Sequence, residues 1–198
     1  MEPKTVIVIG GGPAGALAAL VLKKPGLSPA TFEKRSKNIV PTAPHPFWEV
    51  GGCIDIHSNG IRALERLDLS LIDEVITNSG GTCSKGDFML MDGTDKMYQY
   101  LVPDRPGEHK PLQILQSSFY KILMTRCEKA EIPFNVGKQV VGIEQSDEKV
   151  TATFADGTSA TGDFLIGTDG MNSTVRKLVF PEAKPPQKLG VGPLASST

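Results

Sequence analysis

A glycine-rich turn near the start of the chain constrains its fold more than any other feature. The β-branched run Val6-Ile7-Val8-Ile9 is followed by Gly10, Gly12 and Gly15. Such a run suits a strand that is buried on both faces, and the glycines allow the chain to turn, to approach a pyrophosphate and to pack the next helix on the sheet. The pattern therefore predicts a strand and a helix whose N-terminus faces phosphate groups.

An acidic residue follows at the distance that a dinucleotide site requires. A second predicted strand, residues 29–33, ends at Glu33, 18 positions after Gly15. A carboxylate there can accept hydrogen bonds from the ribose hydroxyls of an adenosine, whereas the alternative is a purely structural glycine turn. The cofactor-binding residues predicted in this part of the chain are Gly10, Gly12, Pro13, Ala14, Gly15, Glu33, Lys34 and Arg35.

The composition indicates a globular chain and names no macromolecular partner. Of the 198 residues, 39% are hydrophobic and 22% are charged, and the net charge of −1 argues against binding to nucleic acid or to an anionic membrane by bulk electrostatics. The three cysteines show neither C-x-x-C nor metal spacing, which favours a reducing compartment, so we expect a cytoplasmic protein without a metal site. We also expect no signal peptide before the first strand, and no apolar run reaches the roughly 18 residues of a membrane span.

Hydrophobic periodicity predicts an α/β fold with a small β insertion. Helical spacing predicts helices over residues 14–24, 71–75 and 116–129. Two more helices are predicted, one capped by Ser58 or Asn59 and a last one that starts near Met171. Strands are predicted over residues 51–57, 134–143, 150–154 and 159–166. Alternation over residues 80–102, around Asp92-Gly93, predicts a β-hairpin on the substrate side of the domain.

A second glycine-containing turn follows the last predicted strand. The chain there reads Asp163-Phe164-Leu165-Ile166-Gly167-Thr168-Asp169-Gly170-Met171-Asn172-Ser173-Thr174-Val175-Arg176. Asp169 comes where a strand ends in the ligand crevice, and the N–H groups at the start of the next helix can face an anion, with Arg176 bracing the turn. The alternative is an ordinary turn followed by a helix cap.

Together the two motifs resemble those of FAD-dependent monooxygenases of the para-hydroxybenzoate hydroxylase type, the group A flavin monooxygenases. The resemblance runs from Thr5 to about Phe180. It implies a Rossmann-like FAD-binding domain of the glutathione reductase type, with FAD as cofactor and NAD(P)H as co-substrate. It also implies that Asp169 and Gly170 lie near the pyrophosphate, that Gln116 reaches the flavin side chain and that Val140 lies beside the adenine. For Gln116 the alternative is a helix cap or a solvated side chain.

Residues 51–69 resemble the family segment that runs beneath the isoalloxazine ring, and their start is similar to that of tetracycline-inactivating members. In this family the cofactor performs the difficult chemistry, and the protein positions and shields the reactants. Among the three histidines only His57 follows a strand near the predicted flavin, with Asp55 on the same face. These two residues are the candidates for a catalytic role, and a structural role is the alternative for both.

The chain departs from the family pattern in several places. Family members carry a third motif, Gly-Asp followed by small residues, but neither Gly86-Asp87 nor Gly162-Asp163 has that continuation. The loop of residues 36–50 contains no Arg to touch the cofactor, although Lys37, His45 or Trp48 could substitute. Most of the substrate sheet that follows the second motif in the family is also missing.

These features lead to one expected organisation and three functional hypotheses. Residues 1–180 form the FAD-binding domain, with residues 78–106 as the hairpin insertion and residues 181–198 as a linker or loose tail. The first hypothesis is an oxidoreductase of secondary metabolism, a monooxygenase that uses NAD(P)H and oxygen to hydroxylate or epoxidise a small aromatic or polycyclic compound. The second is a truncated relative that acts as a binding module or as a redox-neutral cyclase or isomerase. The third is a fragment of a longer enzyme.

Overall fold

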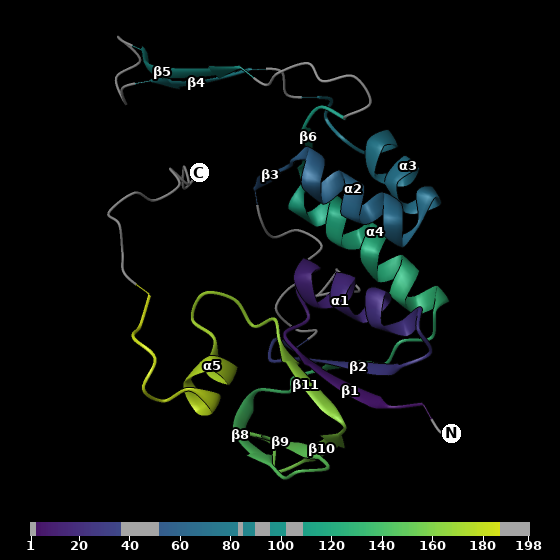
Figure 1. Ribbon diagram of the computed structural model, residues 1–198, viewed down its shortest axis with the longest axis vertical. Helices are drawn as coiled ribbons and strands as arrows, with labels where there is room; N and C mark the ends of the chain where they lie inside the picture. Colours follow the sequence, from purple (N-terminus) through teal and green to yellow (C-terminus); the bar gives the residue numbers. More distant parts are fainter. Residues whose placement is uncertain (1–2, 37–51, 83–84, 90–95, 102–108, 187–198) are drawn as a thin grey trace.

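A four-stranded parallel sheet forms the centre of the fold in the computed structural model, which describes residues 3–36, 52–82, 85–89, 96–101 and 109–186 (Figure 1). Its strands are β1 (Thr5–Ile9), β2 (Ser28–Glu33), β7 (Phe134–Val136) and β11 (Phe164–Gly167), in the order β11-β1-β2-β7. Every neighbouring pair is parallel. Because β1 lies inside the sheet and both faces are covered, Val6 to Ile9 are at most 3% exposed, as the β-branched run predicts.

Helices cover one face of this sheet. Helix α1 (Pro13–Lys23) packs against α4 (Gln116–Lys129), and α2 (Ser58–Leu67) and α3 (Leu69–Thr77) lie on the outer side of α4 (Figure 1). Ala16 and Ala19 of α1 are fully buried in this helical core. Their small side chains allow α1 and α4 to pack closely against each other.

An antiparallel sheet covers the other face (Figure 1). It contains β8 (Val140–Gln145), β9 (Val150–Phe154) and β10 (Ser159–Gly162), in the order β10-β9-β8. Ile7 and Ile9 pack against Phe154 between the two sheets, and the rings of Phe32 and Phe154 stack with their centroids 4.9 Å apart. The three layers confirm the α/β class and match a Rossmann-like FAD-binding domain.

Two of the predicted strands were wrong, because each is divided between the two sheets. Residues 134–143 form β7 in the parallel sheet and β8 in the antiparallel one, with a turn at Gly137, whose φ is +73°. Residues 159–166 likewise divide into β10 and β11. Asp163 stands between these two strands, where its carboxylate accepts a hydrogen bond from the N–H of Thr5 at 2.8 Å.

The remaining elements are short. Strand β3 (Cys53–Ile56) pairs with β6 (Leu112–Leu115), which the sequence analysis missed. The predicted hairpin is present as β4 (Lys85–Met89) and β5 (Lys96–Leu101), drawn far from the parallel sheet in Figure 1, whereas its Asp92-Gly93 turn lies outside the described residues. Helix α5 (Thr174–Val179) begins three residues after the predicted Met171. Within the described ranges no helix is both long and apolar enough to cross a membrane.

One arginine joins α3 to α4. The Arg126 guanidinium donates to Glu74 Oε2 at 2.8 and 3.1 Å, to Asp68 Oδ2 at 3.1 Å and to Ser70 Oγ and O at 2.8 and 3.0 Å. The Ser70 hydroxyl, its N–H and then Arg126 hold the pKa of Asp68 below its usual value. This planar fork therefore binds two carboxylates and a backbone carbonyl at the same time.

Arg126→Ala is expected to lower the free energy of unfolding by about 1–3 kcal/mol, since several charge-assisted but partly exposed hydrogen bonds are lost. Arg126→Lys should recover less than half of this loss, because one ammonium cannot reach all three partners. Urea denaturation followed by circular dichroism measures both variants, with Lys177→Ala on exposed α5 as the control. An unfolding midpoint of Arg126→Lys equal to that of the wild type would show that the fork adds nothing.

Candidate functional site

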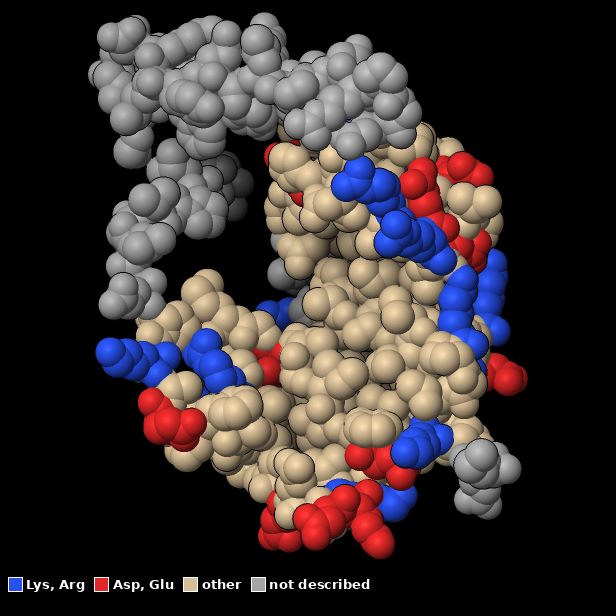
Figure 2. Space-filling view, viewed as in Figure 1, with Lys and Arg blue, Asp and Glu red and all other residues tan. Residues whose placement is uncertain are grey.

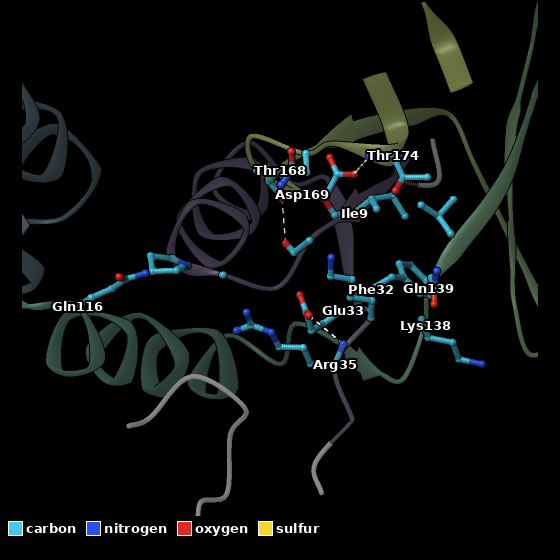
Figure 3. A pocket seen from close by; sticks show the side chains of 17 residues that line it. Ile9, Phe32, Glu33, Arg35, Gln116, Lys138, Gln139, Thr168, Asp169 and Thr174 are labelled. Atoms are coloured by element: carbon cyan, nitrogen blue, oxygen red, sulfur yellow. Dashed lines mark hydrogen bonds between the residues drawn. The ribbon is translucent and has the colours of Figure 1, made fainter. Parts of the chain in front are cut away.

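A pocket lies where β1, β2 and β11 end, and it gathers most of the predicted site residues (Figure 3). The turn from β1 to α1, the end of β2, the segment before β8 and the turn after β11 form its wall, and α4 contributes its first residue. The predicted residues that line it are Gly10, Gly12, Pro13, Glu33, Lys34, Arg35, Gln116, Val140, Asp169 and Gly170. Ala14 and Gly15 do not line it, because Gly15 is buried under the carbonyl oxygen of Gly10 and the exposed Ala14 lies outside the pocket wall.

The glycines of the first turn have different roles. Gly10 has φ of +109°, and a Cβ there would lie 2.6 Å from the backbone of Thr168, while a Cβ at Gly15 would lie 1.9 Å from the carbonyl oxygen of Gly10. The fold itself therefore requires these two glycines. A Cβ at Gly12 would meet no atom within 4 Å, and its backbone is extended, with φ −72° and ψ −174°. Gly12 thus leaves open space in the pocket, as a closely approaching pyrophosphate would need.

Glu33 ties this turn to the end of β2. Its side chain is buried, and Oε2 accepts from the N–H of Gly11 at 2.7 Å while Oε1 accepts from the N–H of Arg35 at 2.9 Å. Each carboxylate oxygen has a second lone pair, so both can still accept from a ligand hydroxyl. Glu33 therefore holds the turn in place, and contact with a ribose remains a prediction.

The second motif is built differently from what we expected. Asp169 Oδ2 accepts from the N–H groups of Thr174 at 2.6 Å and Val175 at 3.1 Å, and Ser173 Oγ accepts from the N–H of Arg176 at 2.9 Å. The expectation that the first amides of α5 face an anion was therefore wrong, because protein side chains already cap them. Asp169 instead shapes the turn that places Gly170 in the pocket wall.

Arg176 braces this turn, as the sequence predicts. Its Nη2 donates to the carbonyl oxygen of Met171 at 3.2 Å. Thr168, which the sequence analysis missed, connects the two motifs, because its hydroxyl lies 2.9 Å from the carbonyl oxygen of Ile9 and 2.8 Å from that of Gly10. Its only signal in the sequence was its place next to Asp169.

Gln116 and the segment before β8 mark opposite ends of the pocket in Figure 3. Gln116 does not cap α4, whose N-cap is Leu115, so one alternative for this residue is removed. At the other end, Lys138 and Gln139 join the predicted Val140, and both were missed because a single basic or amide residue carries no spacing signal.

Lys138 is fixed by the turn between β9 and β10. Its Nζ lies 2.6 Å from Asp156 Oδ2 and 2.8 Å from Thr158 Oγ1. The hydrogen bond from Lys138, followed by those from Thr158, lowers the pKa of Asp156 to about 2. Asp156 is therefore charged at neutral pH and holds Lys138 at this end of the pocket.

The two catalytic candidates lie outside this pocket. Asp55 and His57 are exposed at the end of β3 and the start of α2, on the face opposite to the half-buried Ile54 and Ile56. A role for either residue in catalysis stays a prediction. No group of three potential metal ligands occurs in the described part of the chain, and Lys37, His45 and Trp48 lie outside it.

Comparisons with known proteins agree with this geometry. The family model described as an FAD binding domain matches residues 68–191. The chain is 31% identical over 179 residues to a chloroplastic zeaxanthin epoxidase of Nicotiana plumbaginifolia, covering 88% of this chain and 26% of that protein. It is 28% identical over 177 residues to an FAD-dependent urate hydroxylase of Mycolicibacterium vanbaalenii, covering 88% of this chain and 42% of the relative.

The fold is also shared with a solved structure of tetracycline destructase Tet(51). The TM-score is 0.64 at 24% identity, and the match covers 90% of this chain and 42% of the other. The chain thus spans between a quarter and a half of the length of these proteins.

Proposed function

Because this chain belongs to the family of FAD-binding domains, we propose that the pocket at the ends of β1, β2 and β11 holds FAD for an NAD(P)H- and oxygen-dependent monooxygenase. The observation that carries the proposal is the open space at Gly12, beside two glycines that the fold itself requires. Gly10 and Gly15 fix the backbone of this turn, and Gly12 leaves room beside it for the close approach of a pyrophosphate.

The positions of the lining residues support an assignment of each part of the cofactor. Val140 and Glu33 would hold the adenosine, Gly12 and Gly170 the pyrophosphate, and Gln116 the chain that leads to the flavin. Lys34 and Arg35 add positive charge to the pocket wall, whereas the charge of Lys138 is balanced by Asp156. The carboxylates of Glu33 and Asp169 are already held by backbone N–H groups. The basic side chains of Lys34 and Arg35 therefore favour a ligand with phosphate groups.

The proposed reaction is hydroxylation or epoxidation of a small aromatic or polycyclic compound. Bound FAD would supply electron transfer from NAD(P)H and the activation of oxygen. The residues of this chain that line the pocket would bind and orient the cofactor. Support for the reaction comes from two relatives whose names are epoxidase and hydroxylase.

FAD titration of the purified protein tests the proposal. The expected result is a yellow protein whose flavin absorption bands shift on binding and which oxidises NADPH when a substrate is present. A colourless protein that takes up no FAD even at high concentration would refute the cofactor assignment. If the protein binds FAD tightly but does not oxidise NADPH with any of a broad set of aromatic substrates, the monooxygenase activity is refuted and a redox-neutral relative is favoured.

A further inference from the structure

A second cleft lies at the far end of α1, away from the proposed FAD pocket. It has a volume of about 320 Å³ and forms where the C-terminal ends of α1 and α4 meet the junction of α2 and α3. The 11 residues of α1, about 16 Å at 1.5 Å per residue, separate it from the first glycine turn. A ligand in this cleft would therefore not compete with FAD for space.

The floor of this cleft is apolar. Leu67 and Leu71 are buried in the helical core, and Leu20 and Ala130 are half-buried beside them. Leu20 and Ala130 keep part of their surface open to the cleft, so an apolar group placed there would remove further hydrocarbon surface from water.

Three lysines surround the mouth of the cleft. Lys23, Lys24 and Lys129 are exposed, and within the described ranges none of them has an ion pair shorter than 4.0 Å. Arg126 and Asp68 also line the cleft, but they bind each other at 3.1 Å. The lining thus holds four cations against one carboxylate, in a chain whose net charge is −1. Figure 2 shows Lys and Arg gathered at the right-hand edge, where α1 and α4 end.

Helix dipoles explain part of this arrangement. Lys23 and Lys129 stand in the last turns of α1 and α4, where a positive charge interacts favourably with the free carbonyl groups. That role needs no cavity, and it does not account for an open apolar floor between the two helix ends.

We propose that this cleft binds a small amphiphilic carboxylate, with its hydrocarbon part on the leucine floor and its carboxylate among the three lysines. Charge-assisted hydrogen bonds from ammonium groups suit a carboxylate, and their strength falls with added salt because the lysines are exposed. The cleft is concave and small, so it fits one alkyl or aryl acid and not an extended anionic surface. The proposal does not depend on the function of the FAD pocket.

Isothermal titration calorimetry of the FAD-loaded or FAD-free chain with sodium octanoate, at low ionic strength, tests this site. Octanoate is expected to bind at least about tenfold more tightly than octanol, and octylammonium more weakly than either, because a tenfold ratio is what one charge-assisted contact of about 1.4 kcal/mol gives. Equal affinity for octanoate and octanol would overturn the proposal.

Two variants locate the ligand. Lys23, Lys24 and Lys129 changed together to Gln should weaken octanoate binding at least about tenfold, while the control with Lys4, Lys177 and Lys184 changed to Gln, which removes the same charge elsewhere, should stay within about twofold. If octanoate affinity falls equally in both triple variants, the net charge of the protein explains the effect, and the proposed site is wrong.

Filling the cleft separates it from a charged surface. Ala130→Leu keeps every lysine but occupies the floor, so we expect octanoate affinity to fall at least about tenfold. Circular dichroism checks that this variant is folded. If Ala130→Leu binds octanoate as tightly as the wild type does, the proposal fails. It also fails if the wild type and Ala130→Leu both bind vesicles of anionic phospholipid and sediment with them to the same extent, because the lysines then act as a surface patch.

Discussion

Gly12→Ala is expected to fold like the wild type and to bind FAD about 10- to 100-fold more weakly, a loss of about 1.4–2.7 kcal/mol. The alanine methyl group meets no protein atom within 4 Å, and the extended backbone at this position accepts any residue. The methyl group would instead occupy the space assigned to the pyrophosphate. Fluorescence titration with FAD measures the affinity, and thermal unfolding measures the stability.

Gly10→Ala is the matched control, because it places the same methyl group two residues earlier in the same turn. Its Cβ would lie 2.6 Å from the Thr168 backbone at a φ of +109°, so we expect a loss of more than about 3 kcal/mol in the free energy of unfolding. Wild-type FAD affinity in folded Gly12→Ala would contradict the placement of the pyrophosphate. Wild-type stability in Gly10→Ala would contradict the geometry of the turn.

Glu33 has the second large expected effect. Glu33→Ala leaves the buried N–H of Gly11 and the N–H of Arg35 without their acceptor, so we expect a loss of about 2–4 kcal/mol in the free energy of unfolding. Glu33→Gln keeps one carbonyl oxygen and should lose less. Chemical denaturation of both variants measures this effect.

A comparison of FAD with FMN separates the two roles of Glu33, because FMN contains no adenosine ribose. If Glu33 binds that ribose, Glu33→Gln should weaken FAD about tenfold and leave FMN within about twofold, since one charge-assisted hydrogen bond contributes about 1.5–3 kcal/mol. An equal loss for both flavins would show that Glu33 only positions the turn. No loss for either would contradict both roles.

The sequence predicted those parts of the site that depend on a few neighbouring residues. The turn at Gly10, the end of β2 at Glu33 and the first residue of α4 are each set by local backbone preference and periodicity, and the structure places all three in one pocket. Each motif could therefore be read without knowing what lies next to it in space.

Features that depend on distant contacts were not predicted. Residues 134–143 and 159–166 each contain strand-forming residues on both sides of the break, so the local pattern does not show that the chain changes sheets at Gly137 and at Asp163. Strand β6 is defined by its pairing with β3, across more than 50 residues. The acceptors of Thr168 lie 158 and 159 positions earlier in the chain, and periodicity carries no information over that range.

The position of β11 beside β1 has a consequence for the order of events during synthesis. The pocket joins Gly10 and Gly12 to Asp169 and Gly170, which are made about 160 residues later. Closing contacts of such long range is slow, and a growing chain held on the ribosome has no β11 to offer until nearly all of the described residues have emerged. A nascent chain would therefore expose the glycine turn without its partner, and the complete pocket would be available to the cofactor only after β11 and the turn that follows it have been made.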